Sequence, residues 1–281
     1  MLRIREMRTT DIPFAIRLTN PEGWGIPARD FRRIIRLDGR GSFVATEGKQ
    51  RVGLATTAHY GRQIAWIGNV VVGKKYRQRH IGQRLVEHAI KYLSRMRVRH
   101  IALYSFKENF RFYRNLGFVQ GAAFVRLRRE PEARRFAKGT TFKALALSSV
   151  LSMDRKAFGA DRRLLITSLL DAGAAWYLGF RIGPSGSYVV VKTYRDMNEI
   201  GPWVSFASDS RNLESLLRLV IDRSDRKPIE ASCPVTNRQA LRIMKKNHFH
   251  TIHRGRVMFY GQVARIGQPS AIVAHGFLDK G

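Results

Sequence analysis

The first 130 residues contain segments with two different spacings of apolar positions. Residues 64–72 are apolar on both faces of an extended chain, which is typical of a buried strand. The next apolar residues recur at helical spacing and predict a helix with one buried face: Ile81, Leu85, Ala89, Leu93 and Met96. A strand followed by an amphipathic helix therefore stands at the centre of this half.

Further elements on both sides predict the order strand, two helices, three strands, helix, strand, helix, strand. A capping side chain and an early proline, Asp11 and Pro13, predict a helix that starts near Thr10. A second helix is expected after Pro27, and a short one ends at Gly117. The other strands are expected at 4–7, 43–46 and 52–60 and from residue 118 onward. This order predicts an α/β (α+β) fold with a mixed sheet flanked by helices.

The loop between the central strand and its helix is basic. Arg77, Arg79 and Arg84 surround a place where the backbone N–H groups of the loop and of the helix start point outward. Guanidinium groups donate paired hydrogen bonds to phosphate oxygens, so the junction predicts a pyrophosphate site. From these residues alone, the alternative is an ordinary strand–loop–helix junction that binds nothing.

Two separated motifs together resemble the GNAT family of acyl-CoA N-acyltransferases. The family's phosphate loop, Gln/Arg-x-x-Gly-x-Gly/Ala, is matched in order by Arg77, Gln78, Arg79, His80, Ile81 and Gly82. The second motif, ENFRFYRNLGF at 108–118, resembles the family helix that carries Tyr before Leu-Gly-Phe. His80 departs from the family by replacing its first glycine. We expect either a less close backbone approach to the pyrophosphate or an imidazole contact in its place.

The resemblance implies acetyl-CoA as cosubstrate and direct transfer of its acetyl group to a primary amine. It also implies that Tyr113 protonates the departing thiolate; the alternative is a core aromatic with a backbone partner. In the family the pantetheine arm adds to the edge of the fourth strand, and a backbone N–H polarises the thioester carbonyl. The residues expected at the coenzyme are Val70, Val71, Val72, Arg77, Gln78, Arg79, His80, Ile81, Gly82, Gln83, Arg84, Asn109 and Phe112.

The general base cannot be assigned by this resemblance. The family often places a carboxylate on the fourth strand, and residues 64–72 contain none. The candidates are Glu22, His59, a carboxylate of the second half, or water relayed by Asn69, although a histidine at a strand end is more often structural. Trp24 and Trp66 either line the acceptor pocket or pack in the interior.

The chain is about twice the length of one such unit, and the pattern restarts after a charged stretch. We expect a catalytic domain at 1–130, a linker at 131–140 and a second GNAT-like domain at 141–281. In the second domain, strands are expected near 142–147, 176–180 and 188–192. The counterpart of the phosphate loop and its helix is expected at 201–221, and that of the tyrosine helix at 237–249.

The second domain is expected to be a degenerate copy. Met244 stands where the first copy has Tyr113, and His248 where it has Gly117, so we expect no coenzyme and no chemistry there. The whole resembles tandem GNAT proteins in which the second unit covers the acceptor site of the first. Three hallmarks of that unit are matched by Asp154, Asp161 and Arg162, and a fourth by a turn at 201–203.

Those acidic residues have two interpretations. Facing the first unit, Asp154 and Asp161 would attract a cationic amine. Alternatively, they cap helices and pair with Arg155 or Arg162, which would make them structural.

The resemblance does not explain the charge of the chain. There are 51 Lys and Arg residues against 21 Asp and Glu residues, giving a net charge of +30. Such a charge attracts nucleic acid or another polyanion. The basic residues are spread over the whole chain, however, so a basic surface without such a partner is an equal alternative.

Few other features point to a compartment or partner. Cys233, the single cysteine, excludes an intrachain disulfide, and no signal peptide or bilayer-spanning stretch is visible. We therefore expect a cytoplasmic protein without membrane contact, and no metal is indicated.

The first hypothesis is an N-acetyltransferase for a small-molecule amine. The alternatives are a protein lysine or N-terminal acetyltransferase, or a non-catalytic acyl-CoA-binding protein associated with nucleic acid. The acceptor, the acyl chain length and the oligomeric state stay open.

Overall fold

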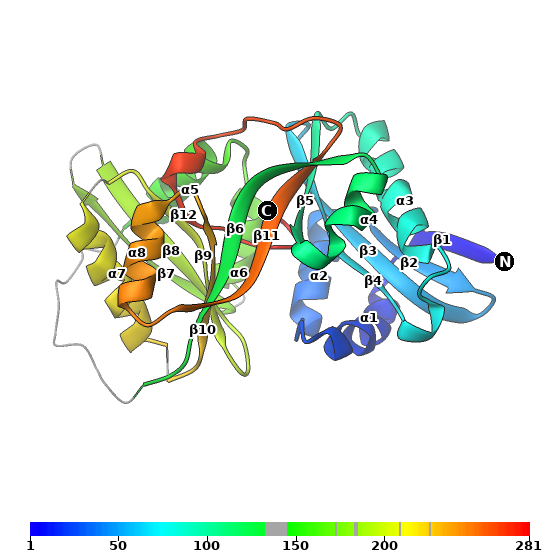
Figure 1. Cartoon of the computed structure of the whole chain (residues 1–281), viewed down its shortest axis with the longest axis horizontal. Helices are drawn as coiled ribbons and strands as arrows, with labels where there is room; N and C mark the ends of the chain where they lie inside the picture. Colours follow the sequence, from blue (N-terminus) through cyan, green and yellow to red (C-terminus); the bar gives the residue numbers. More distant parts are fainter. Residues whose placement is uncertain (133–144, 172, 183–184, 208, 225) are drawn as a thin grey trace.

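The structure, a computed structural model, describes residues 1–132, 145–171, 173–182, 185–207, 209–224 and 226–281 (Figure 1). In the first half the strands are β1 (Leu2–Glu6), β2 (Ser42–Glu47), β3 (Gln50–Tyr60), β4 (Ile64–Val72), β5 (His100–Phe106) and β6 (Phe118–Arg129). The helices there are α1 (Ile12–Thr19), α2 (Ala28–Leu37), α3 (Ile81–Arg95) and α4 (Phe110–Asn115).

The second half repeats this order from its helices onward. Its helices are α5 (Leu147–Phe158), α6 (Arg163–Asp171), α7 (Ser210–Asp222) and α8 (Arg238–Lys246). Its strands are β7 (Ala175–Ile182), β8 (Ser185–Thr193), β9 (Asn198–Ser205), β10 (Ile229–Pro234), β11 (His250–Tyr260) and β12 (Ile272–Ala274). We call residues 1–117 and 145–249, without their long last strands, the first and second units.

The two units exchange their last long strands. The described strands form one sheet in the order β1-β2-β3-β4-β5-β11-β6-β10-β9-β8-β7, with β12 pairing β9. Strand β11 of the second half thus pairs with β5, and β6 of the first half pairs with β10 (Figure 1). Most neighbours are antiparallel, while β4–β5 and β9–β10 are parallel. Each unit therefore completes its sheet with a strand from the other.

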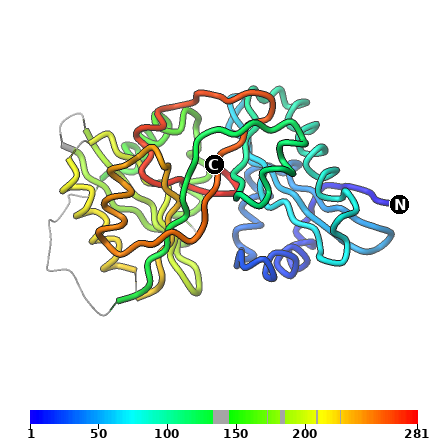
Figure 2. The backbone as a smooth tube through the Cα atoms, in the orientation of Figure 1, coloured from blue at the N-terminus to red at the C-terminus, as the bar shows by residue number. Residues whose placement is uncertain are grey.

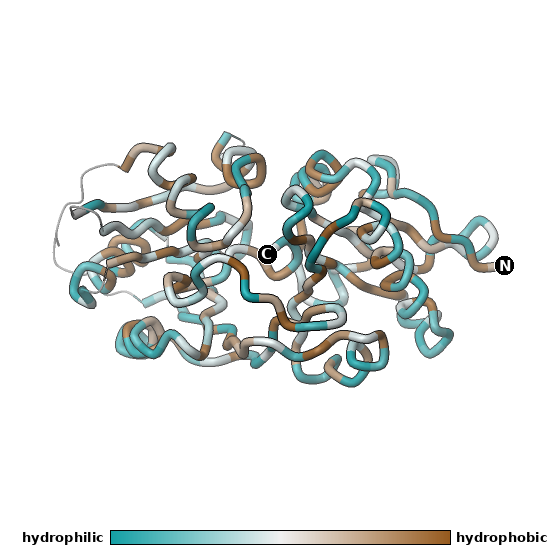
Figure 3. Tube along the Cα trace, turned by 90° about the horizontal axis from the view of Figure 1, so that it is seen from above, coloured by the Kyte–Doolittle hydropathy of each residue, from teal (hydrophilic) through white to brown (hydrophobic). Residues whose placement is uncertain are grey.

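Helices cover both faces of the first unit's sheet. One face of α3 buries Ile81, Leu85, Val86, Ala89 and Leu93, which pack against β2–β5. On the other face, α1 and α2 bury Ile12, Phe31 and Ile34 against β2, β3 and β4. Apolar stretches run through the strands of both units, with polar stretches on the outer turns (Figure 3). Removing this apolar surface from water is the main force that holds the layers together.

Several expected elements differ from the structure. The strand expected near 142–147 is wrong at its end, because Leu147 begins helix α5; residues 142–144 and most of the expected linker lie outside the described residues. The turn expected at 201–203 is also wrong. Gly201, Pro202 and Trp203 lie within β9, where its register against β8 shifts. Met96 follows the end of α3 and is largely exposed, so it is not part of the apolar face.

Candidate active site

Strands β4 and β5 pair over a short stretch and then diverge. The parallel pairing joins Ile64, Ala65 and Trp66 to His100, Ile101 and Ala102, and no later residue of β4 pairs with β5. From Ile67 onward the β5-facing edge of β4 therefore offers backbone donors and acceptors without a strand partner. An extended ligand with amide groups can add to this edge as a further strand would.

A β-bulge lies at the start of this unpaired edge. Leu54 of β3 pairs with Val71 but Thr56 pairs with Gly68, so β4 has one extra residue there. Asn69 adopts a positive φ of 50°, and its side-chain Nδ2 donates to Thr56 Oγ1 at 3.0 Å. The bulge takes residues 69–70 out of the regular ladder, because neither of them has a pairing partner on β3.

The basic loop leads directly into α3. Gln78 and His80 have positive φ angles of 63° and 56°, and His80 is the residue before the first helical turn. The imidazole Nδ1 lies 3.2 Å from Gln83 Oε1 and does not cap the helix. Histidine is one of the residues that occur in this left-handed region, so the loop keeps a turn that the family makes with glycine. Within the described residues, the first N–H groups of α3 have no side-chain cap.

Arginine side chains of the loop are held by carboxylates from other elements. The Arg77 guanidinium lies 2.5 Å from Glu22, which belongs to the turn after α1, and also donates to the Val72 carbonyl at 3.1 Å. Arg79 lies 2.8 Å from Glu47 at the end of β2. All of these side chains are partly exposed. The structure thus brings Glu22 to the phosphate loop rather than to the bulge.

The tyrosine helix lies against the start of α3. A Cβ atom at Gly82 would lie 3.6 Å from the Phe112 ring and 3.7 Å from Val72, so these three residues meet at the end of β4. Tyr113 packs edge-on against Phe112 and Phe118. Partial burial raises the pKa of the Tyr113 phenol, which keeps it protonated, and its hydroxyl makes no hydrogen bond among the described residues. A neutral, unengaged phenol is suited to donate a proton.

The corresponding opening of the second unit is filled by the chain itself. Strands β9 and β10 also pair in parallel over only three residues, Asn198–Ile200 with Ile229–Ala231. Beyond that point β12 pairs with Val204 and Trp203 of β9, on the side away from β8. Residues 272–274 therefore take the place that the divergence leaves open beside β4 in the first unit.

The start of α7 also differs from the start of α3. Asp209 caps α7, because its Oδ1 accepts from the Arg211 N–H at 2.9 Å. A carboxylate at this place repels an anion and occupies the donors that would bind it. Met244 of α8 is completely buried in the core, and His248 has a positive φ of 65°, like Gly117 at 87°. These contacts support a second unit without coenzyme chemistry.

The acidic hallmarks of the second unit are engaged in structure. Asp154 is buried and accepts from Arg162 at 2.6 and 3.1 Å and from the Tyr188 hydroxyl. Asp161 is half exposed and accepts from the Arg163 N–H at the start of α6. These contacts favour the interpretation in which both carboxylates are structural, and Asp154 pairs with Arg162 as that alternative states.

The two tryptophans of the first unit differ in burial. Trp66 is 4% exposed and stacks on Tyr104 with ring centres 4.5 Å apart, while Trp24 is 43% exposed on the loop before α2. Trp66 is thus an interior residue, and of these two only Trp24 is open to solvent.

Two further residues singled out in the sequence are shielded from solvent to different degrees. His59 is partly buried, with its Nε2 4.0 Å from Asp38. Cys233 is buried in β10, where burial raises the pKa of its thiol to about 12.

Sequence reasoning did not identify residues 275–281, which return from β12 to the first unit (Figure 2). A Cβ atom at Gly68 would lie 2.3 Å from the Asp279 carbonyl oxygen, and Asn69 Nδ2 donates to Asp279 Oδ2 at 3.1 Å. Gly68 was the available signal, because glycine inside a strand often marks a close approach of other backbone. Asp279 is a second-half carboxylate, the class proposed for the base without a residue being named.

The described residues contain neither a cluster of metal ligands nor a membrane-spanning helix. No group of three or more His, Cys, Asp and Glu side chains there is arranged to hold a metal ion. No helix in that part of the chain combines the length and apolar character needed to cross a membrane.

Comparison with known proteins identifies one matching segment in each half of the chain. Residues 9–118 match the acetyltransferase (GNAT) family, and residues 150–270 match an acetyltransferase (GNAT) domain. A search of curated protein sequences found no match.

Solved structures share the arrangement over the whole chain. A provisionally assigned acetyltransferase from Pyrococcus horikoshii superposes with a TM-score of 0.81 at 21% identity, covering 100% of this chain and 96% of that one. A GCN5-related N-acetyltransferase from Sphaerobacter thermophilus has a TM-score of 0.63 at 13% identity, covering 98% and 97%. At these identities the likeness establishes the fold. With the two matching segments, the diverging β4–β5 edge and the loop before α3, the chain belongs to the GNAT acetyltransferase family, whose members transfer acyl groups from acetyl-CoA, and carries two GNAT domains in tandem.

Proposed function

We propose that this protein is an acetyl-CoA-dependent N-acetyltransferase that acetylates a small primary amine in its first unit. The observation that carries the proposal is the difference between the two units. The first has an unpaired β4 edge, an uncapped helix start beside Arg77 and Arg79, and the partly buried phenol of Tyr113. In the second, each of these features is filled, capped or replaced.

The coenzyme would lie along β4. The N–H groups at the start of α3 and the arginines of the loop would hold the pyrophosphate. The pantetheine amides would pair with the edge that includes Val70, Val71 and Val72, and Gly82 leaves room beside Phe112. An N–H group at the Asn69 bulge would donate to the thioester oxygen as charge develops on it.

Proton transfer to sulfur is assigned to Tyr113. As the C–S bond breaks, the phenol would donate its proton to the thiolate. The raised pKa favours the protonated form that this role requires. Gly82 of α3 lies close to both Phe112 of α4 and Val72 of β4, which supports a coenzyme position within reach of α4.

A small acceptor is favoured over a protein segment by residues 275–281. They lie on β4 at Gly68 and Asn69, and the Tyr60 hydroxyl holds them by donating to the Lys280 carbonyl at 2.6 Å. A fixed segment at this point restricts the width of any acceptor that approaches the bulge.

The test is a thiol-release assay with acetyl-CoA and a panel of primary amines, polyamines, amino acids and lysine peptides. Release with small amines, in excess of that with peptides, is expected. Preference for peptides would support a protein acetyltransferase. Tight acetyl-CoA binding without release for any amine would support a non-catalytic binding protein. Strong dependence on salt would point to a polyanionic partner.

A further inference from the structure

Asp279 lies where the first unit lacks a carboxylate. Strand β4 carries no acidic side chain between Ile64 and Val72. The Asp279 side chain reaches the bulge of this strand from the second half, 3.1 Å from Asn69 Nδ2, and is 21% exposed. It is therefore largely enclosed but open to a small solute.

One oxygen of this carboxylate is available. Oδ2 accepts from Asn69 and from the Lys280 ammonium at 2.5 Å, while Oδ1 has no hydrogen-bond partner among the described residues. The contact with Lys280 shows that a primary ammonium group fits against this carboxylate. A substrate ammonium can bind the free oxygen by the same charge-assisted bond.

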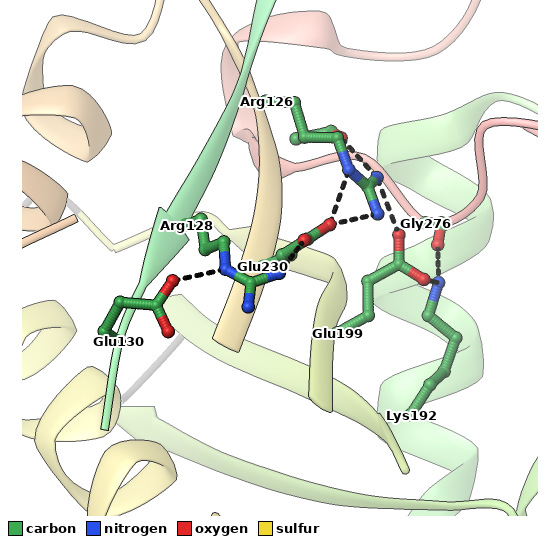
Figure 4. A network of polar contacts seen from close by, with 8 residues as sticks. Arg126, Arg128, Glu130, Lys192, Glu199, Glu230 and Gly276 are labelled. Atoms are coloured by element: carbon green, nitrogen blue, oxygen red, sulfur yellow. Dashed lines mark hydrogen bonds and ion pairs between the residues drawn. The ribbon is translucent and has the colours of Figure 1, made fainter. Parts of the chain in front are cut away.

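The segment that carries Asp279 is fixed at several points. The Lys192 ammonium donates to the Gly276 carbonyl at 2.6 Å and pairs with Glu199 at 2.7 Å (Figure 4). Arg126 of the exchanged strand β6 joins the same network through Glu199 at 3.2 Å. At the other end Arg162 donates to the Gly281 carbonyl at 2.5 Å. Asp279 is thus held between two anchored ends, which suits a residue that must stay in place.

The position of Asp279 along β4 also suits contact with an acceptor. Gly68, beside Asp279, and Val72, beside Phe112, are four residues apart, or about 13 Å along an extended strand. The pyrophosphate end of a coenzyme would lie at Val72 and its thioester nearer the bulge. An acceptor at Asp279 would then approach the thioester from the end opposite the phosphates.

We infer that Asp279 binds the ammonium group of the acceptor and acts as its general base; this rests on the proposed function. One ammonium proton passes to the carboxylate and then to solvent. The amine nitrogen forms a bond to the thioester carbon, and the C–S bond breaks. The nitrogen loses its second proton to solvent, and Tyr113 protonates the thiolate and regains a proton from solvent. The products are the amide, free coenzyme thiol and one released proton.

The test compares Asp279→Asn with the unchanged protein in the thiol-release assay from neutral to alkaline pH. Asparagine keeps the shape and can still accept from Asn69, so the segment stays in place. At neutral pH kcat/KM for alkylamines should fall about 100-fold or more, with unchanged acetyl-CoA affinity. The loss should shrink as pH rises, because the acceptor then arrives without its extra proton. Asp196→Asn, in the exposed β8–β9 turn, is the matched control and should change nothing.

Three other outcomes would overturn the inference. Full activity of Asp279→Asn with an unchanged pH profile would show that the carboxylate is not used, while leaving the acetyltransferase assignment intact. An equal loss at every pH would show that Asp279 only positions the segment. Absence of transfer in the unchanged protein would remove the proposed function and this inference together.

Discussion

His80 and Asp209 occupy equivalent places, immediately before α3 and α7, but only Asp209 bonds a backbone N–H of its helix. The first helix start is therefore left open for an anion, and the second is closed by a carboxylate of the chain. The two helix starts also differ in backbone conformation, because His80 is left-handed with a φ of 56° whereas Asp209 is extended with a φ of −73°.

Residue 80 should affect coenzyme binding through its backbone. Its φ of 56° is strained for a β-branched side chain, so His80→Val should disturb the loop and weaken acetyl-CoA binding about tenfold. His80→Gly restores the residue that fits this conformation and should bind at least as tightly as histidine. Calorimetric titration of both variants gives the comparison. Tighter binding of acetyl-CoA by His80→Val than by His80→Gly would show that the left-handed conformation of residue 80 does not govern coenzyme binding.

Tyr113→Phe should separate catalysis from binding. Loss of the phenolic proton should lower kcat about 100-fold, while the ring keeps its packing against Phe112 and Phe118. Acetyl-CoA affinity should stay nearly unchanged in calorimetry. Equal losses in turnover and affinity would assign the residue to the structure of the site.

Asp154→Asn should destabilise the second unit strongly. It leaves the buried Arg162 guanidinium without its ion pair, which typically costs about 3–5 kcal/mol of unfolding free energy. Urea unfolding measures the change. Asp161→Ala removes only a partly exposed hydrogen-bond acceptor at the start of α6 and should cost about 1 kcal/mol. Similar costs for the two variants would contradict the structural role given to Asp154.

His275 should make the protein sensitive to acid. Burial, aided by Arg162, lowers the pKa of its imidazole to about 3, and the Tyr104 hydroxyl lies 3.0 Å from its Nδ1. In the unfolded chain the pKa is about 6.5, so below that pH the unfolded state binds more protons. Stability from this group is complete above pH ~6.5 and is lost as pH falls toward 3, by up to about 1.4 kcal/mol per pH unit.

The variant for this test is His275→Gln, which stays neutral and can still accept from Tyr104. Its unfolding free energy should fall less steeply than that of the unchanged protein as the pH is lowered through this range. Parallel curves for the two proteins would show that other groups govern the acid response.

Much of the first unit follows from local sequence patterns. The apolar run of β4, the periodicity of α3 and the stop at Gly117 each specify their own element, and the structure confirms all three. An unpaired edge on β4, which the addition of a pantetheine arm requires, is also present. The residue-level roles at the coenzyme and the acceptor stay predictions.

The exchange of β6 and β11 could not be predicted in this way. β6 and β11 follow the same order of elements in their two halves of the chain. The alternation of apolar and polar side chains along a strand specifies its two faces, but not which chain segment pairs with its edge. The position of Asp279 likewise depends on contacts between residues some two hundred positions apart, such as its bond with Asn69. Gly68 was a hint of close backbone contact, but it did not name the segment that approaches.

The most direct test of the central claim is a calorimetric titration of the full chain with acetyl-CoA. We predict one site per chain, which Gly82→Trp abolishes by filling the space beside Phe112 and Val72. Ser210→Trp, at the start of the capped helix α7, should leave binding unchanged. No heat with acetyl-CoA, or a site that survives Gly82→Trp and is lost in Ser210→Trp, would contradict the account.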